Sequence, residues 1–158
     1  ETAETTGIVM VLVMAAAALG WCVSISRLPQ TLTPMILSVV DSPLVFLLLV
    51  NVLLLIIGCF MEALAAMLIL IPILGPAAAS YGIDPVQFGV IVVLNLIIGT
   101  ITPPMGVVLF VVTRIAEISL ESMSRAILPW LVPLLIVLLT ISMWPPLTTW
   151  LPQFLAGS

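Results

Sequence analysis

Histidine is absent from this sequence, and charged side chains are scarce, with three basic and seven acidic residues among 158. An enzyme that works inside a membrane is therefore disfavoured, because there is no histidine, no serine paired with a base and no apolar segment with two acids. So few basic residues form no positive patch, which argues against nucleic acid as a partner. Cys22 and Cys59 have no second cysteine or histidine nearby, so neither a metal site nor a redox motif is indicated. We expect no enzyme activity and no bound cofactor.

Apolar residues dominate the chain. Hydrophobic residues make up 63% of it, charged residues 6%, and the mean hydropathy is +1.46, whereas about a quarter of the residues in soluble domains are charged. The charged residues fall between the apolar runs, and only Glu62 lies deep within one. This pattern predicts an all-α integral membrane protein that crosses the lipid bilayer several times. Because the chain begins at Glu1 instead of methionine, and its first apolar run lacks the basic start of a signal peptide, we expect a piece of a longer protein.

The first and last apolar runs predict ordinary membrane segments. Residues 1–42 contain a spanning helix, from about 7 to 26, followed by an amphipathic stretch typical of a short interfacial segment. Residues 118–158 contain a C-terminal transmembrane helix, from 127 to about 150. This helix is expected to follow a charged loop and to end among prolines and tryptophans at the membrane interface.

The run over residues 43–80 is too long for one membrane span, because a single straight helix would extend about 55 Å across a hydrocarbon core of about 30 Å. The expected break lies near its centre, at residues 58–62. Two arrangements remain: two full spans joined by a tight turn, or a re-entrant hairpin whose tip stops within the membrane. A turn at the membrane surface usually holds several polar residues. This one holds a single charge, so the re-entrant hairpin is favoured, with Pro72 and Pro76 expected to bend or end its second arm.

Residues 95–106 are the most informative stretch, because two prolines, two threonines and two glycines interrupt an otherwise apolar run there. Proline lacks a backbone donor and clashes with the preceding turn, so the helix should open into two half-helices with free carbonyl and N–H groups. Secondary transporters build ion and substrate sites from such breaks. Residues 81–117 are therefore predicted to form a discontinuous transmembrane helix, and transport is the function that this pattern favours.

The candidate ion- and substrate-binding residues come from the hairpin break and the broken helix. They are Gly58, Glu62, Asn95, Gly99, Thr100, Thr102, Pro103, Pro104 and Gly106. Thr100 and Thr102 are the candidate Na⁺ ligands, because hydroxyl and carbonyl oxygens suit a hard cation better than a soft metal. The alternative for Asn95 and the threonines is interhelical hydrogen bonding, which is the interpretation given to Asn51 in the first hairpin arm.

Glu62 is a separate case, because an acid near the bilayer centre is costly and is by default a functional candidate. A glutamate at this point would also be favoured by the free N–H groups and the dipole at the start of the second hairpin arm. A protonated acid bonded to the backbone is a further alternative. The sequence leaves these alternatives open.

Several short motifs also follow one another along the chain in a recognisable order. They are residues 58–62, Pro72, residues 82–89, Asn95-Leu96, Ile98-Gly99, residues 102–106, Leu128-Pro129 and residues 150–152. In this order they resemble the large membrane (permease) subunit of the tripartite ATP-independent periplasmic (TRAP) transporters. The similarity covers essentially the whole chain and corresponds to the C-terminal portion of that subunit. Similar proteins usually carry aspartate where this chain has Glu62.

The resemblance implies a Na⁺-coupled symporter that imports organic acids across the bacterial or archaeal cell inner membrane by an elevator-type movement. It implies two partners, a small membrane subunit and a soluble periplasmic binding protein that delivers the substrate. In this family two inverted repeats each hold a re-entrant hairpin and a discontinuous helix, and this chain resembles the second repeat. The hairpin tip and the helix break would then form one Na⁺ site and a wall of the substrate site.

A non-transporting structural or assembly subunit of the membrane is the alternative function. It would explain the apolar segments, but not a break at Thr102-Pro103-Pro104 that destabilises a span unless something uses it. An effect of Na⁺ on the protein distinguishes the two hypotheses.

Overall fold

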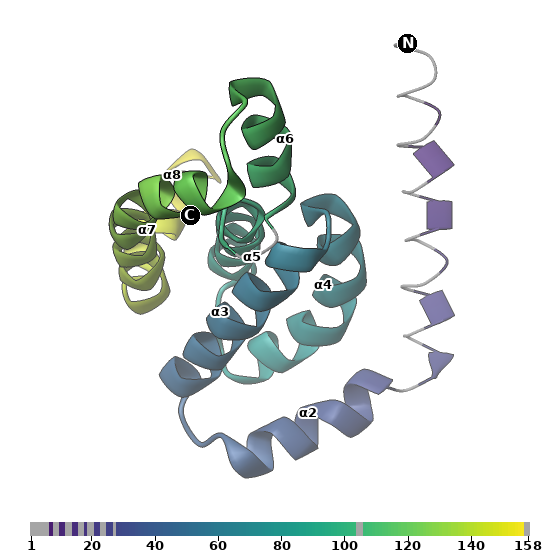
Figure 1. Cartoon of the computed structure of the whole chain (residues 1–158). Helices are drawn as coiled ribbons and strands as arrows, with labels where there is room; N and C mark the ends of the chain where they lie inside the picture. Colours follow the sequence, from purple (N-terminus) through teal and green to yellow (C-terminus); the bar gives the residue numbers. More distant parts are fainter. Residues whose placement is uncertain are drawn as a thin grey trace.

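The computed structural model describes residues 28–103 and 106–156, together with scattered positions between 7 and 26. The predicted first spanning helix therefore lies largely outside the described residues, and Pro104 lies outside them too. Every regular element in the described part is a helix (Figure 1). These helices are α2 (Leu28–Val39), α3 (Pro43–Phe60), α4 (Ala63–Ser80), α5 (Pro85–Thr100), α6 (Val107–Ala116), α7 (Leu120–Met143) and α8 (Pro146–Ala156). The all-α prediction is confirmed.

The apolar run over residues 43–80 forms a two-helix hairpin. Its arms, α3 and α4, are each 18 residues long, or about 27 Å at a rise of about 1.5 Å per residue. They meet at Met61 and Glu62, where the break was predicted, and their other ends are joined by the stacking of Phe46 on Tyr81. Both arms are long and apolar enough to cross a membrane. Length alone therefore leaves the two arrangements of the hairpin open, and the re-entrant form stays a prediction.

The prolines of the second arm do not end it. Pro72 and Pro76 both lie inside α4, which continues to Ser80. A transmembrane helix tolerates such prolines where neighbouring groups satisfy the freed carbonyls. The chain then reverses at Tyr81 and Gly82, and Gly82 adopts a positive φ of 72°, a backbone conformation that favours glycine.

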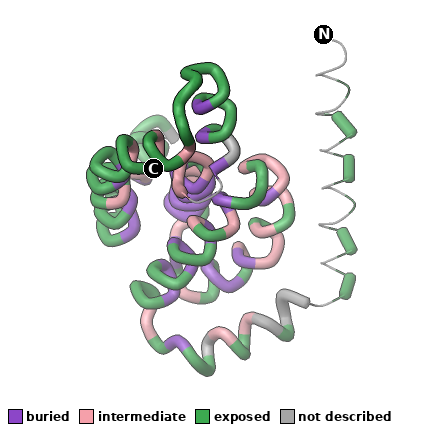
Figure 2. Tube along the Cα trace, in the orientation of Figure 1, coloured by how far each residue is buried: buried purple, intermediate pink, exposed green. Residues whose placement is uncertain are grey.

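The helix α5 occupies the centre of the described fold. It begins at Pro85, whose missing N–H is not needed in the first turn of a helix, and Asp84 caps it by accepting hydrogen bonds from Val86 N (2.8 Å) and Gln87 N (3.4 Å). It packs against α3, α4 and α7. Figure 2 shows the buried residues concentrated around α5, while the outer surfaces of α7 and α8 are exposed. Those exposed surfaces are largely apolar, as expected for helices that face lipid.

The short helix α2 lies across the open end of the hairpin (Figure 1) and packs against α4. Its 12 residues span about 18 Å, too little to cross a bilayer. The segment after α2 is fixed by Tyr81, whose hydroxyl donates to the carbonyl of Val40 at 2.6 Å and whose ring stacks on Phe46 with centroids 4.7 Å apart. The interfacial position of this segment in the membrane stays a prediction.

The C-terminal helix begins earlier than predicted. The expected helix over residues 127–150 is instead α7, which begins at Leu120. Ser119 caps it by accepting from Ser122 N at 3.2 Å, and an exposed Glu121–Arg125 ion pair at 2.7 Å supports the first turns. The prediction placed these polar residues in a loop. The predicted loop was wrong, because a serine N-cap and an i,i+4 ion pair are also common in the first turns of a helix.

The same helix also ends earlier, at Met143, and the chain resumes at Pro146 as the separate helix α8. Pro145 and Pro146 account for this interruption, since neither can donate the hydrogen bond that would continue α7. Trp150 and Phe154 stack on α8 with centroids 5.9 Å apart. The predicted exit of the membrane segment is therefore a short helix in its own right.

Candidate ion and substrate site

The hairpin tip and the helix break touch through two glycines. A Cβ added to Gly99 would lie 2.6 Å from Gly58 Cα, and a Cβ added to Gly58 would lie 2.9 Å from the carbonyl oxygen of Leu96. Neither position has room for a side chain, and the nearest atoms are main-chain atoms. The last turns of α3 and α5 are therefore in direct backbone contact. Two regions that are far apart in the sequence form one junction.

The break itself is a compact turn between α5 and α6. Two hydrogen bonds between residues close in sequence stabilise this turn, from Thr102 N to Gly99 O at 3.0 Å and from Gly106 N to Thr102 O at 3.2 Å. A Cβ on Gly106 would collide with the carbonyl group of Thr100, so the restart of the helix at Val107 depends on this glycine. Pro103 lies within the turn, where helix geometry is already lost. The predicted discontinuity of residues 81–117 is present in the structure, and Figure 1 shows α6 extending beyond the ends of α3 and α5.

The two threonine hydroxyls are anchored at the end of α5. Thr100 Oγ1 donates to Ile97 O at 2.7 Å, and Thr102 Oγ1 donates to Ile98 O at 2.6 Å. A hydroxyl that donates its hydrogen keeps its lone pairs, so both oxygens can still coordinate a cation. The described residues hold no group of three or more His, Cys, Asp or Glu that could bind a metal. Na⁺ is a hard, monovalent cation, and neutral hydroxyl oxygens of this kind are suitable ligands for it.

Glu62 caps the second hairpin arm. Its Oε1 accepts from Leu64 N at 2.8 Å and its Oε2 from Ala65 N at 2.9 Å. These N–H groups belong to the first turn of α4 and have no partner within the helix. Capping alone therefore explains an acid at the tip, which was one of the alternatives read from the sequence. A part for Glu62 in ion binding stays a prediction.

Asn95 lies one turn before Gly99 and is completely buried, with 0% exposure. Its Nδ2 donates to Asn51 Oδ1 at 2.7 Å and to Ile91 O at 2.8 Å. Asn51 in turn donates from Nδ2 to Ser142 Oγ at 3.0 Å. The structure thus places Asn51 in the interhelical role predicted for it, and Asn95 shares that role. Asn95 Oδ1 is buried and has no hydrogen-bond partner within the described residues.

Sequence reasoning missed Ser142. It is 4% exposed and lies on α7 among apolar residues. A polar residue near the end of an apolar span is the signal that could have found it, because such residues often hydrogen-bond across helices. Gln87 was also missed as an interhelical donor, although its Nε2 donates to Ile141 O (3.1 Å) and Ser142 O (3.3 Å).

The structure brings most of the candidate residues together at this junction. Gly58, Gly99, Thr100, Thr102, Pro103 and Gly106 form the tip and the break, Glu62 caps the tip, and Asn95 lies one turn deeper. The position of Pro104 is outside the described residues. The assignment of these residues to ion and substrate binding stays a prediction.

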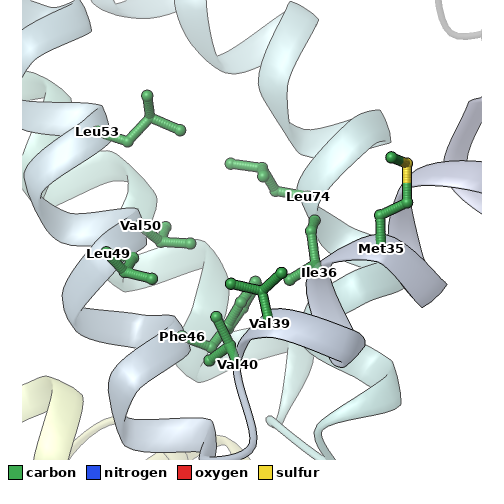
Figure 3. Close-up of a pocket in the computed structure, with 9 residues that line it drawn as sticks. All are labelled: Met35, Ile36, Val39, Val40, Phe46, Leu49, Val50, Leu53 and Leu74. Carbon is green, nitrogen blue, oxygen red and sulfur yellow. The ribbon is translucent and has the colours of Figure 1, made fainter.

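A separate hollow of about 390 Å³ lies between α2, α3 and α4 (Figure 3). It is lined by Met35, Ile36, Val39, Val40, Phe46, Leu49, Val50, Leu53 and Leu74. These side chains carry no oxygen or nitrogen, so the hollow offers nothing that would recognise an organic acid or a cation. It is not a candidate for the ion or substrate site.

A hairpin that touches a discontinuous helix, in a protein whose α3, α4 and α7 are each apolar enough to span a membrane, is typical of multi-pass membrane proteins of the transporter class. Residues 1–147 match the family described as "Tripartite ATP-independent periplasmic transporter, DctM component", and the chain belongs to this family. The predicted family is confirmed. Its members are transporter permeases and not enzymes, as expected.

Curated relatives match nearly the whole chain. The sialic acid TRAP transporter large permease protein SiaM of Vibrio cholerae is 48% identical over 99% of this chain and 37% of its own length. The isethionate TRAP transporter permease protein DctMQ of Oleidesulfovibrio alaskensis is 44% identical over 99% of this chain and 24% of its own length. The C4-dicarboxylate TRAP transporter large permease protein DctM of Vibrio cholerae is 36% identical, and the chain covers 35% of it. The chain thus spans about a third or less of these relatives, which agrees with the expected C-terminal portion.

Proposed function

We propose that this chain supplies one ion and substrate half-site of a Na⁺-coupled permease that imports organic acids across a bacterial or archaeal inner membrane. The permease would work with a small membrane subunit and would receive its substrate from a periplasmic binding protein. Family membership and the names of the relatives support this proposal, since sialic acid, isethionate and C4-dicarboxylates are all organic acids. The contact between Gly58 and Gly99 is the structural observation that carries it.

This contact brings helix ends of both polarities to one place. The C-terminal ends of α3 and α5 present carbonyl groups, which favour a cation, and the N-terminal end of α6 presents N–H groups, which favour an anion. At the start of α4, Glu62 already accepts from the N–H groups of Leu64 and Ala65. The two threonine hydroxyls lie at the end of α5. A Na⁺ ion and an organic carboxylate therefore both have suitable partners at the junction, without a charged residue other than Glu62. Bound Na⁺ would add positive charge beside the carboxylate and so favour its binding, which couples the two.

The elevator-type movement is part of the proposal. Residues from α3, α4 and α5 share one hydrophobic core, so the hairpin and the first half of the discontinuous helix can move together as one unit. A re-entrant hairpin would place the junction within the membrane. This arrangement is supported by α6, which continues beyond the tip (Figure 1).

The test is uptake by proteoliposomes that contain the complete permease, its small subunit and its binding protein. Radiolabelled sialic acid, isethionate and a C4-dicarboxylate would be supplied with and without an inward Na⁺ gradient. Uptake that depends on the gradient supports the proposal and identifies the substrate. Absence of uptake for every acid, together with no effect of Na⁺ on thermal unfolding, would favour the alternative of a structural or assembly subunit.

A further inference from the structure

A chain of buried hydrogen bonds crosses from α7 through α3 to α5. Ser142 Oγ donates to Leu138 O at 2.9 Å, Asn51 Nδ2 donates to Ser142 Oγ, and Asn95 Nδ2 donates to Asn51 Oδ1. Asn51, Asn95 and Ser142 are 3%, 0% and 4% exposed. Polar groups buried this deeply are normally all paired. The exception is Asn95 Oδ1, which has no partner in the part of the chain that the structure describes.

The direction of these bonds fixes the orientation of both amides. Ser142 has one hydroxyl hydrogen and gives it to Leu138 O, so it can only accept from Asn51. Asn51 must therefore turn its Nδ2 toward Ser142 and its Oδ1 toward Asn95. Asn95 turns its Nδ2 toward both Asn51 Oδ1 and Ile91 O, which leaves Asn95 Oδ1 without a donor. Two acceptors therefore fix the Asn95 amide: Ile91 O, which is part of α5 itself, and Asn51 Oδ1, whose direction follows from Ser142.

Asn51 and Asn95, which are linked by this chain of hydrogen bonds, lie on the same helix faces as the glycine contact. Asn51 precedes Gly58 by about two turns of α3, and Asn95 precedes Gly99 by about one turn of α5. The amide pair therefore sits in the α3–α5 interface, next to the junction of tip and break. Gln87 holds the backbone of Ser142 against the start of α5, which keeps the hydroxyl in place.

We propose that Ser142 and Asn51 are positioning residues that orient the Asn95 amide, so that Asn95 Oδ1 serves as an oxygen ligand of the coupling Na⁺. This inference rests on the proposed function. An amide oxygen is a hard, neutral ligand of the kind that Na⁺ takes. Leaving it buried and unpaired would destabilise the protein, and a bound cation removes that cost. Without Ser142, Asn51 loses the hydrogen bond that directs its Oδ1 toward Asn95, and the Asn95 amide is then held by Ile91 O alone.

The experiment compares Ser142→Ala with Ser142→Thr and with Thr140→Ala in the complete permease. Thr140 is the matched control, because its hydroxyl also donates to a carbonyl one turn back, Ile136 O at 2.7 Å, but it is exposed on the same helix. The half-saturating Na⁺ concentration for uptake, the maximal rate and the Na⁺-induced shift of the unfolding temperature are measured for each variant. Asn51→Leu is the second variant if Ser142→Ala does not fold.

Ser142→Ala is expected to raise the half-saturating Na⁺ concentration by about three- to fivefold, the effect of losing one neutral hydrogen bond. The maximal rate should be kept, Ser142→Thr should restore the wild-type value, and Thr140→Ala should leave it unchanged. A lower unfolding temperature with an unchanged Na⁺ concentration dependence, in Ser142→Ala and Asn51→Leu alike, would overturn the inference and leave a structural role alone. A wild-type protein that shows no Na⁺ dependence in uptake or unfolding would instead overturn the proposed function itself.

Discussion

Gly58 and Gly99 are 41 positions apart in the sequence, yet each occupies the space that a side chain on the other would need. Because both helices present bare backbone at this point, α3 and α5 approach more closely than any larger residue would allow. The junction of hairpin tip and helix break depends on this approach. The contact is therefore the first place to test the site.

Gly99→Ala is expected to separate the two helix ends. The added methyl group must displace backbone, so unfolding should become easier by about 1–3 kcal/mol, as for other overpacked sites, and uptake should be lost. Gly89→Ala is the matched control on the same helix, because a Cβ there meets nothing within 4 Å; it should leave uptake unchanged. Thermal unfolding and initial uptake rates measure both effects. Normal uptake by Gly99→Ala would show that the close approach is not needed for transport.

Thr102→Val is expected to weaken Na⁺ activation while expression stays normal. Valine keeps the shape of threonine but removes the oxygen that is available to a cation, so the half-saturating Na⁺ concentration should rise about tenfold or more. Thr148→Val, which removes an exposed hydroxyl bonded only to Pro145 O, is the control. Uptake by both variants is measured over a series of Na⁺ concentrations. An unchanged Na⁺ dependence in Thr102→Val would remove this residue from the site.

Glu62 can be tested by comparing it with Asp84, since both acids cap a helix and only Glu62 lies at the hairpin tip. Glu62→Ala and Asp84→Ala should each destabilise the protein by about 1 kcal/mol through loss of the cap. Glu62→Asp should retain most of the stability, because aspartate is a preferred capping residue. If Glu62 also helps to bind the ion, only Glu62→Ala will raise the half-saturating Na⁺ concentration. Equal Na⁺ dependence in the two alanine variants would assign Glu62 to capping alone.

Tyr81→Phe tests the attachment of α2 to the hairpin. The variant removes the hydrogen bond to Val40 O and keeps the ring that stacks on Phe46. Stability should fall by about 1 kcal/mol, the net value of one hydrogen bond, and the Na⁺ dependence of uptake should not change, because the turn lies at the opposite end of α4 from the tip. Chemical or thermal unfolding of the purified permease provides the measurement. A changed Na⁺ dependence would mean that this end of the hairpin also influences the junction.

Local sequence chemistry was enough to predict the parts of the fold that one segment determines by itself. The Thr102-Pro103-Pro104 stretch predicts the break after Thr100, and the position of Gly58 to Glu62 in an overlong apolar run predicts the hairpin. The start of α7 was misjudged because Glu121 and Arg125 carry the same charges whether they lie in a loop or in the first turns of a helix.

The chain of hydrogen bonds from Ser142 through Asn51 to Asn95 could not be predicted from the sequence in the same way. Asn51 and Asn95 are separated by 44 residues, and Asn51 and Ser142 by 91. Whether they meet depends on how α3, α5 and α7 rotate about their own axes, which no local pattern specifies. The sequence identified Asn51 and Asn95 as polar residues in apolar runs, but their partners and the free oxygen of Asn95 came from the packing of the helices.

The main-chain contact between α3 and α5 has a mechanical consequence. Side chains between two helices can rotate about their bonds and absorb a small displacement, whereas the atoms at Gly58 and Gly99 have no such bonds. A shift of the hairpin tip toward α5 is therefore passed directly to the carbonyl groups at the end of α5. The tip and the break are therefore expected to move as one unit, so a displacement at the end of α5 is transmitted to the hairpin.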